Sequence, residues 1–493
     1  MRPGCFGGRT TVRPYSRRSP RPGQVQHAAP PSCLLPLASR LTSNLQPLIV
    51  HRYFPHTPDD IKAMLGQCGL NELRELYSDV PEELMLKEPY NLPPQMSEPQ
   101  VRRFFSELGS RNRTGLVCFA GAGFYDHYSP AVALNLTQRS EFLTAYTPYQ
   151  PEISQGTLQY IFEYQSMMAR LTGMDISNAS MYDGATATAE AMLMAVAAGR
   201  KKRRVLVSDT INPAYRRVVD TYAHYHGIEV ESIAMEEGVT SRADLEKKLA
   251  EYTDVAAVIV PIPNYYGIIE DHSGLADLVH SRKALLVMTC VASDLASLRT
   301  PGEWGADIAC GDAQSLGIPL SFGGPYLGFL CSTKALMRKM PGRVVGATRD
   351  SEGRRCFVLT LQAREQHIRR EKATSNICSN QGLMTLYVSI YMSLMGAEGL
   401  REINERSHAG AEYLLGKLTA DGRARLKYPG KPFLNEFLLE TDYKVDTLIH
   451  SCVKKAGILP GVKVSDNEIL IAVTEMQTRE DMDRLAAVAR ECM

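Results

Sequence analysis

The strongest constraint on the fold of this chain is a series of short apolar segments that alternate with helical segments between residues 116 and 330. The apolar segments lack the regular polar alternation of a half-exposed strand, which indicates burial on both faces. Such strands, separated by helices, predict a mainly parallel α/β sheet. The predicted strands are Arg204–Ser208, Val255–Pro261, Ala284–Met288, Ala306–Cys310 and Gly328–Cys331, and the predicted helices include Leu158–Leu171, Ala187–Ala198 and Ala243–Glu251.

The rest of the chain divides around this α/β region. We predict an extension over residues 1–49, a helical arm over 50–115, a large α/β domain over 116–340 and a small α+β domain over 341–493. In the arm, Thr57-Pro58-Asp59-Asp60 has the composition of a capped helix start. The arm's short amphipathic helices cannot bury themselves alone, so we expect them to pack on a larger body. In the last domain, a long helical zone at Gln381–Ala420 precedes a strand–helix–strand–helix series at Pro432–Glu440, Val445–Ala456, Glu468–Val473 and Arg479–Glu491.

The first 52 residues contain no acidic side chain, whereas arginines recur among Pro, Ser and Gly. This composition is typical of a mitochondrial transit peptide, and a start site placed too far upstream would also produce it. The many prolines argue against a transit helix, so we favour the second interpretation and exclude residues 1–49 from the fold. A cytoplasmic location is then expected, with the mitochondrial matrix as the alternative.

The composition gives no sign of a nucleic-acid-binding or membrane protein. The net charge of +1 gives no reason to expect a nucleic acid or an acidic membrane surface, and no apolar run reaches the roughly 20 residues that span a bilayer. The 11 cysteines are scattered, without a CxxC pair, which favours reduced thiols in a cytosol-like compartment. His224 and His226 have no carboxylate or cysteine at useful spacing, so no metal site is predicted.

One short motif could bind an anion. Asp183-Gly184-Ala185-Thr186 lies immediately before a predicted helix, where unpaired N–H groups and the positive end of the helix dipole face outward. Many folds hold a cofactor phosphate in this way. An Asp-Gly pair before a helix is first of all an N-cap and a turn, however, and spacing alone favours that interpretation.

Several longer motifs together resemble one family. They are Gly121–His127, Tyr146–Gly156, Tyr182–Gly184, Gly323–Pro325 and Arg364–Cys378. From His51 to the C-terminus the chain is similar to the glycine decarboxylase P-protein family, and in detail to the alpha, or first, subunit of those members in which the P-protein is split into two chains. The single-chain form of the P-protein is about twice as long as this chain, which is the length expected if this chain corresponds to one half of it.

The resemblance implies a fold, a cofactor and a reaction. The fold is that of pyridoxal-phosphate (PLP)-dependent transferases of the aspartate aminotransferase type (fold type I), with an N-terminal arm, a large mainly parallel α/β domain and a small C-terminal α+β domain. The reaction is that of glycine dehydrogenase (aminomethyl-transferring), in which glycine is decarboxylated through PLP and the aminomethyl group passes to the lipoyl arm of H-protein. The implied partners are the beta subunit, H-protein and the other glycine cleavage components.

Enzymes of this fold need a lysine that binds the cofactor as a Schiff base, and usually an acid beside the pyridine nitrogen. The lysine should follow the strand Ala306–Cys310, where this chain has Gln314 and Ser315, and no lysine occurs between Lys283 and Lys334. Lys334 is expected to begin a solvated helix. Lys372 lies in the charged run Arg364–Lys372, which is either a solvated helix face or part of an interface. The acid should end the strand Ala284–Met288, yet the nearest one, Asp294, lies farther into the loop.

We therefore expect no catalytic residue on this chain, only a vestigial cradle at Asp183–Thr186 and PLP held covalently by a lysine-bearing beta subunit. The best candidate to reach the partner's site is the segment Tyr146–Gln155, in which Tyr146, Thr147, Tyr149, Gln150 and Gln155 are set among stiffening prolines. Core packing of both tyrosines is the alternative. Arg139 and Glu141 should support the segment, and Asp126 and His127 either line the cleft or make structural hydrogen bonds. Two other functions stay open: a self-sufficient PLP-dependent lyase or transferase, and a non-catalytic scaffold.

Overall fold

The protein is described by a computed structural model over residues 53–85, 88, 90–199, 201–362, 366–373 and 375–491. These residues form two compact units that divide between Arg103 and Phe104. The predicted extension, residues 1–49, lies outside the described residues.

The first unit is built from short helices: α1 (Pro58–Gln67), η1 (Leu73–Tyr77), η2 (Glu82–Leu84) and the start of α2 (Glu98–Ser110). The predicted start of α1 is confirmed, because Thr57 and Asp60 form a capping box and Pro58 occupies the first turn. Of the α1 side chains only Leu65 is buried. Large apolar side chains of this unit are exposed, namely Tyr53, Phe54, Met64, Leu73, Leu76, Tyr77, Val80, Leu84, Tyr90, Leu92, Met96 and Val101.

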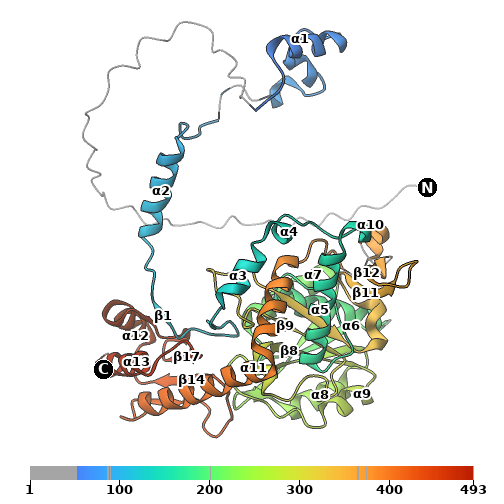
Figure 1. Ribbon diagram of the computed structural model, residues 1–493. Coiled ribbons are helices and arrows are strands. Elements are labelled where there is room, and N and C mark those ends of the chain that lie inside the picture. Colours follow the sequence, from blue (N-terminus) through green and yellow to red (C-terminus); the bar gives the residue numbers. More distant parts are fainter. Residues whose placement is uncertain are drawn as a thin grey trace, which may run out of the picture. The chain divides into compact units, whose positions relative to one another are not determined.

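The second unit is organised around a seven-stranded sheet of order β2-β10-β9-β8-β7-β3-β4, which the labels β8 and β9 mark in Figure 1. The strands β9, β8, β7, β3 and β4 run parallel, and β10 is antiparallel to both of its neighbours. The mainly parallel sheet predicted from the apolar segments is therefore confirmed. Its strands are β2 (Ile176–Ser177), β3 (Arg204–Ser208), β4 (Glu229–Ile233), β7 (Val255–Ile262), β8 (Leu285–Val291), β9 (Ile308–Asp312) and β10 (Gly328–Ser332).

Helices cover both faces of this sheet, because its strands are apolar on both sides. On one face, strand residues such as Val207 and Ile259 pack with Met192 and Val219 from α6 (Gly184–Ala198) and α7 (Pro213–His226). On the other face, residues such as Val258 pack with four further helices. These are α5 (Gln155–Thr172), α8 (Arg242–Glu251), α9 (Leu275–Ser281) and the first part of α11 (Gly382–Leu418).

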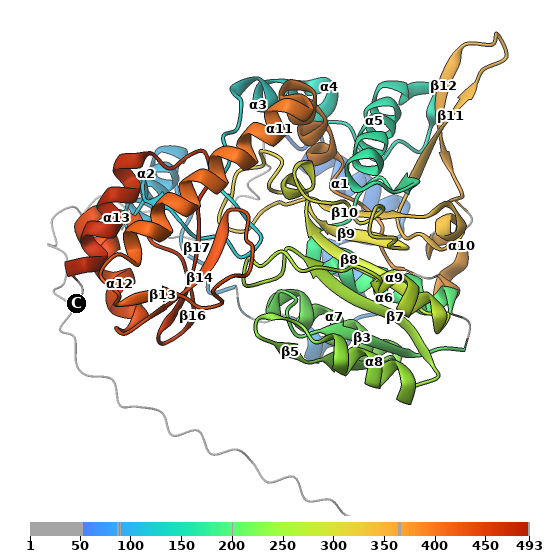
Figure 2. The ribbon, with the colours of Figure 1, turned by 90° about the horizontal axis from the view of Figure 1, so that it is seen from below.

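Helix α11 joins the two cores of this unit (Figure 2). Tyr391 packs with the large sheet, whereas Leu414 packs in the core of the C-terminal domain, and non-helical backbone angles at Gly396 mark a kink between them. Among the described helices, α11 is long and apolar enough to cross a membrane by length and composition. Its apolar side chains are instead used in packing the two cores.

The C-terminal domain is a four-stranded antiparallel sheet of order β13-β14-β17-β16 with helices packed against it. The strands are β13 (Ala424–Leu426), β14 (Glu436–Thr441), β16 (Val462–Ser465) and β17 (Glu468–Ala472), and the helices are α12 (Val445–Ser451), the π-helical turn η8 (Cys452–Ala456) and α13 (Arg479–Glu491). A short strand from early in the chain, β1 (Val117–Cys118), pairs with β15 (Ile458–Leu459) at this domain.

Smaller elements complete the second unit. They are α3 (Ala131–Thr137), α4 (Ser140–Leu143), η3 (Pro151–Ile153), the hairpin β5 (Met235–Glu236) and β6 (Val239–Thr240), η4 (Ser293–Ala296), η5 (Lys334–Lys339), the hairpin β11 (Val344–Arg349) and β12 (Arg355–Thr360), α10 (Gln366–Arg369) and η7 (Arg370–Lys372). The β11–β12 hairpin and α5 flank the segment Tyr146–Gln155, which contains η3.

Candidate functional site

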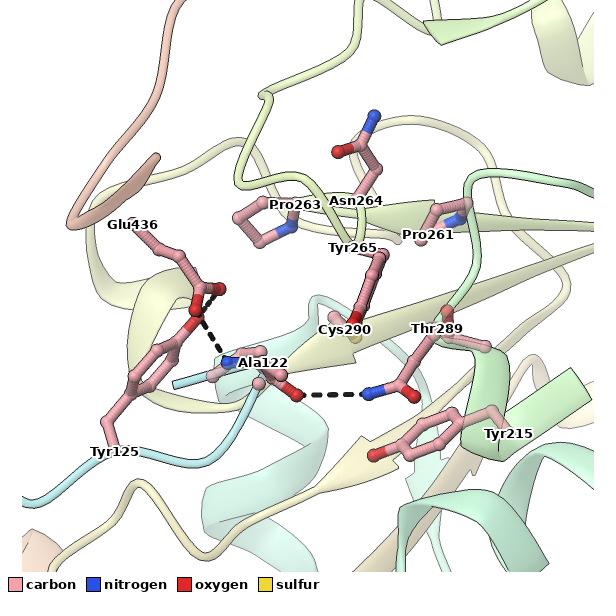
Figure 3. A pocket seen from close by; sticks show the side chains of 13 residues that line it. Ala122, Tyr125, Tyr215, Pro261, Pro263, Asn264, Tyr265, Thr289, Cys290 and Glu436 are labelled. Atoms are coloured by element: carbon pink, nitrogen blue, oxygen red, sulfur yellow. Dashed lines mark hydrogen bonds between the residues drawn. The ribbon is translucent and has the colours of Figure 1, made fainter. Parts of the chain in front are cut away.

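A cleft lies at the carboxyl ends of β7 and β8, where open α/β sheets bind their ligands. The space that it leaves for water-sized molecules is about 50 Å³, enough for a few waters. Its walls come from the two domains of the second unit and from the segment 122–125 (Figure 3). The lining residues are Ala122, Gly123, Tyr125, Asn212, Tyr215, Pro261, Pro263, Asn264, Tyr265, Thr289, Cys290, Val291 and Glu436.

Gln314, which follows β9 where the lysine was expected, is fully buried and makes three hydrogen bonds. Its Oε1 accepts from the backbone N–H of Tyr125 at 2.9 Å, and its Nε2 donates to the carbonyl oxygens of Tyr125 and Ile318 at 2.8 and 2.6 Å. Ser315 is also buried and accepts a hydrogen bond from the backbone N–H of Ser293 at 3.1 Å. Both side chains fasten loops together, and neither is free for chemistry.

The N-terminus of α6 is the predicted anion cradle, and its first donors are bound by carboxylates of the chain itself. Asp183 accepts from the backbone N–H of Thr186 at 2.8 Å. Asp312, at the end of β9, accepts from the N–H of Gly184 at 2.9 Å and from the N–H of Gln314 at 2.8 Å. Burial raises the pKa of Asp312 to about 7, although these two N–H groups act in the opposite direction.

The backbone of the cradle is also covered by a ring. A Cβ added at Gly184 would lie 2.0 Å from the hydroxyl of Tyr215, so this tyrosine packs directly against the glycine. With Asp312 on the Gly184 amide, Tyr215 over the backbone and Gln314 in the lysine position, the residues present do not fit a phosphate-bearing cofactor bound through lysine. Ala185 is half-buried, and no hydrogen bond of its side chain is possible.

The acid expected beside a pyridine nitrogen is not among the cleft residues. The end of β8 contributes Thr289, Cys290 and Val291 to the wall. Asp294 lies in η4, fully buried, where it accepts a hydrogen bond from the hydroxyl of Ser293 at 3.0 Å. Burial raises the pKa of Asp294 to about 7.

Glu436, on β14 of the C-terminal domain, was not predicted from the sequence. It accepts from the backbone N–H of Ala122 at 2.5 Å and from the hydroxyl of Tyr125 at 2.9 Å (Figure 3). Burial raises its pKa to about 7. Asn212 donates to the carbonyl of Ala122 from the opposite side at 3.0 Å. An acid between the apolar residues Phe433-Leu434 and Phe437–Leu439 was the available signal for such a contact.

Asp126 and His127 lie beside the cleft but do not line it. His127 Nδ1 is 2.8 Å from Glu475 Oε2, and the backbone carbonyl of Asp126 accepts from the hydroxyl of Thr474 at 2.7 Å. For His127 the structure shows a hydrogen bond to Glu475, and for Asp126 it shows one through the backbone alone. Lys334 and Lys372 are both exposed and neither lines the cleft.

The segment Tyr146–Gln155 lies elsewhere, because none of its residues lines the cleft. Tyr146 is 74% exposed and Tyr149 is 48% exposed, so neither is a core residue. Thr147 is half-buried and its carbonyl accepts from the N–H of Tyr149 at 2.9 Å, while Gln150 is exposed.

Gln155 fixes the end of this segment to the β11–β12 hairpin. Its Oε1 accepts from the N–H of Phe357 and its Nε2 donates to the carbonyl of Phe357, both at 2.9 Å. The same Nε2 donates to the carbonyl of Pro151 at 2.6 Å. Arg139 and Glu141 form an exposed ion pair just ahead of the segment. Among the residues that the structure describes, no group of three or more His, Cys, Asp and Glu side chains could hold a metal ion.

Comparisons with known proteins agree with this architecture. The model of the family described as glycine cleavage system P-protein matches residues 51–489. A protein named probable glycine dehydrogenase (decarboxylating) subunit 1, from Carboxydothermus hydrogenoformans, is 48% identical over 445 residues, which cover 89% of this chain and 99% of that protein.

Solved structures of known proteins share the fold of this chain. A crystal structure of glycine decarboxylase (P-protein) of the glycine cleavage system, in inhibitor-bound form, superimposes with a TM-score of 0.82 at 41% identity, over 90% of this chain and 100% of that one. An alanine–glyoxylate aminotransferase from Nostoc sp. gives a TM-score of 0.56 at 14% identity, over 83% of this chain and 98% of that one, a likeness of fold alone. The resemblance drawn from the motifs and the predicted fold class are both confirmed.

Proposed function

The chain belongs to the glycine cleavage system P-protein family, and from this premise we propose that it is the first, or alpha, subunit of a two-chain glycine dehydrogenase (aminomethyl-transferring). In this proposal the assembled enzyme decarboxylates glycine and passes the aminomethyl group to the lipoyl arm of H-protein. The full-length match to a relative named subunit 1 supports a chain that works with a second subunit.

The observation that carries the proposal is that the lysine position and the cradle are both occupied by the chain's own side chains. Gln314 uses its amide in three hydrogen bonds, and Asp312 binds the amide of Gly184 in the cradle. We infer that PLP is held covalently by a lysine of the beta subunit. There it would supply the electron sink for loss of CO2 from glycine.

This chain would then act on the partner's site through exposed side chains. Tyr146 and Tyr149 offer apolar rings with hydroxyl tips, which suit an interface that must also be polar. Pro148 and Pro151 limit the backbone freedom of the segment and Gln155 fastens its end to the hairpin, so that the rings are held in place before the partner binds. In this proposal Tyr146 and Tyr149 orient groups in the active site of the beta subunit and exclude water from it.

Apolar side chains exposed on the second unit near the tyrosine segment, including Leu143 and Ile153, support a partner at this surface. Permanent subunit interfaces are large and apolar. We propose that the beta subunit covers this surface.

The cysteines support a reducing compartment such as the cytoplasm. Seven cysteines of the described part of the chain are free thiols, namely Cys68, Cys118, Cys290, Cys310, Cys331, Cys356 and Cys378.

The test is reconstitution. The chain is purified alone, mixed with its lysine-bearing subunit, and assayed for exchange of labelled CO2 into the carboxyl group of glycine in the presence of H-protein. We expect exchange only when both chains are present, and a fall of about tenfold or more when Tyr146 is replaced by Ala, because a hot-spot aromatic at an interface contributes about 2 kcal/mol or more. Tyr225→Ala, on the exposed face of α7, is the matched control and should leave exchange unchanged.

The other outcomes separate the alternatives. Exchange by the chain alone would establish a self-sufficient PLP enzyme. A stable complex that binds H-protein while the lysine-bearing subunit is equally active without this chain would establish a scaffold.

A further inference from the structure

Arg343 carries a buried positive charge that no described carboxylate compensates. The side chain is 4% exposed, and its Nε and Nη1 groups have no hydrogen-bond partner among the described residues. By contrast, the half-buried Arg204 is paired with three carboxylates, those of Glu229, Glu231 and Asp254. Burying an unpaired guanidinium is costly, so such a group is expected to serve an anion that binds nearby.

The backbone around Arg343 is fixed on both sides. The carbonyl of Arg343 accepts a hydrogen bond from the N–H of Ala179 at 2.7 Å. Two residues further on, the backbone N–H and C=O of Val345 each form a hydrogen bond with the side chain of Gln165, both at 2.9 Å. The guanidinium is therefore held in position beneath the surface.

Among the described residues, the guanidinium of Arg343 has one hydrogen-bond partner, the hydroxyl of Tyr149. Arg343 Nη2 donates to Tyr149 Oη at 3.1 Å, and the guanidinium carbon lies 5.4 Å from the centroid of the same ring. Arginine has no acceptor, so the tyrosine oxygen must accept and its own O–H is left to donate elsewhere. The Tyr149 side chain is half exposed, so part of it is open to a partner chain.

We propose that Arg343 and Tyr149 form an anion-recognition pair that this chain contributes to the partner's active site, with Tyr149 as the contacting donor and Arg343 as the positioning residue. The inference rests on the proposed function, because it requires Tyr149 to reach the partner. A hydroxyl donor backed by a buried cation is suited to the oxygen of an anionic group. Two anions of the reaction have this chemistry, the carboxylate of glycine and the phosphate of the cofactor.

The experiment is a double-mutant cycle in the reconstituted two-chain enzyme, with Tyr149→Phe, Arg343→Met and the double variant. Glycine KM and kcat are measured by CO2 exchange, and the cofactor dissociation constant is measured by absorbance titration of the cofactor-free complex with PLP. Loss of a hydrogen bond to a charged group predicts a change of about tenfold or more in one of these constants for Tyr149→Phe. A change in glycine KM with little change in kcat identifies the carboxylate as the anion, and a change in the PLP dissociation constant identifies the phosphate.

The cycle also separates positioning from mere structural support. If Arg343 acts through the tyrosine hydroxyl, the double variant should resemble Tyr149→Phe, and Arg343→Lys should restore part of the affinity lost in Arg343→Met. The control pair is Tyr225→Phe and Arg217→Met, both exposed on α7.

Three outcomes would overturn the inference. Unchanged constants in Tyr149→Phe would do so, and this variant removes a single hydroxyl from a half-exposed side chain, so it is informative even where Arg343→Met fails to fold or assemble. Additive effects in the double variant would also do so. Inactivity of the wild-type mixture would overturn the proposed function and this inference with it, whereas an active mixture with unaffected variants would overturn the inference alone.

Discussion

Replacement of Gln314 by Ala tests whether the residue in the lysine position has become a structural element. The side chain is fully buried, and its removal leaves the N–H and C=O of Tyr125 and the C=O of Ile318 without their partner. A hydrogen bond contributes about 1 kcal/mol net, and a buried group left unpaired costs about 1–3 kcal/mol. Water can enter the adjacent cleft and satisfy part of the loss, so we expect destabilisation of about 2–4 kcal/mol.

The assay is urea unfolding of the purified chain followed by circular dichroism, with the midpoint and slope fitted together. The expected result is a lower midpoint at an unchanged slope, because the surface exposed on unfolding does not change. The matched control is Gln138→Ala, an exposed glutamine after α3, which should stay within about 0.5 kcal/mol of the wild type. If Gln314→Ala is as mild as this control, the hydrogen bonds of Gln314 do not stabilise the fold and the reasoning is refuted.

Three further predictions concern the same cleft and the tyrosine segment. Burial raises the pKa of Asp312 to about 7, so the folded chain holds this proton more tightly than the unfolded chain does. The contribution of Asp312 to the free energy of unfolding therefore grows as the pH falls from about 7 toward 4, by up to about 1.4 kcal/mol per pH unit. In Asp312→Asn the unfolding midpoint should depend less on pH across that window than in the wild type. The same dependence on pH in both proteins would contradict this. Gly184→Ala places a Cβ 2.0 Å from the hydroxyl of Tyr215 and should cost about 1–3 kcal/mol in thermal unfolding, whereas Gly416→Ala, which meets no atom within 4 Å, should be neutral or stabilising; equal effects would refute the close approach. Gln155→Ala releases the tyrosine segment from the β11–β12 hairpin, so it should lower the rate of CO2 exchange by the two-chain enzyme even at temperatures where the variant chain is fully folded. A lower melting temperature with full activity would count against a role for the segment.

The large sheet was predictable because burial on both faces leaves an unmistakable apolar run. The strand Arg204–Ser208 was predicted at its observed bounds, and β7 was predicted to within one residue. The start of β8 was also found within one residue, but its end was placed too early because Thr289 interrupts the apolar run. The β11–β12 hairpin was missed, because its strands are partly exposed and carry polar residues on one side.

The feature of the site that could be predicted from the sequence is the missing lysine. The family resemblance supplied the place of the expected lysine, and the order of the predicted strands located Gln314 there. The contacts that fill the cleft join residues far apart in the chain: Asp312 binds an amide 128 positions away, and Glu436 binds one 314 positions away. No local pattern reports such contacts. Arg343 likewise had no sequence signal, since its significance comes from burial without a carboxylate.

Borohydride reduction of the reconstituted two-chain enzyme, followed by peptide mass mapping, tests most directly whether this chain works without a covalent cofactor of its own. Reduction fixes the PLP label on the lysine that forms the Schiff base. The expected result is a label on a lysine of the partner and none on this chain, which on its own should show no visible absorbance with PLP beyond that of nonspecific surface lysines. A stoichiometric label on this chain, at Lys334, Lys372 or any other lysine, would contradict the proposed division of labour between the two subunits.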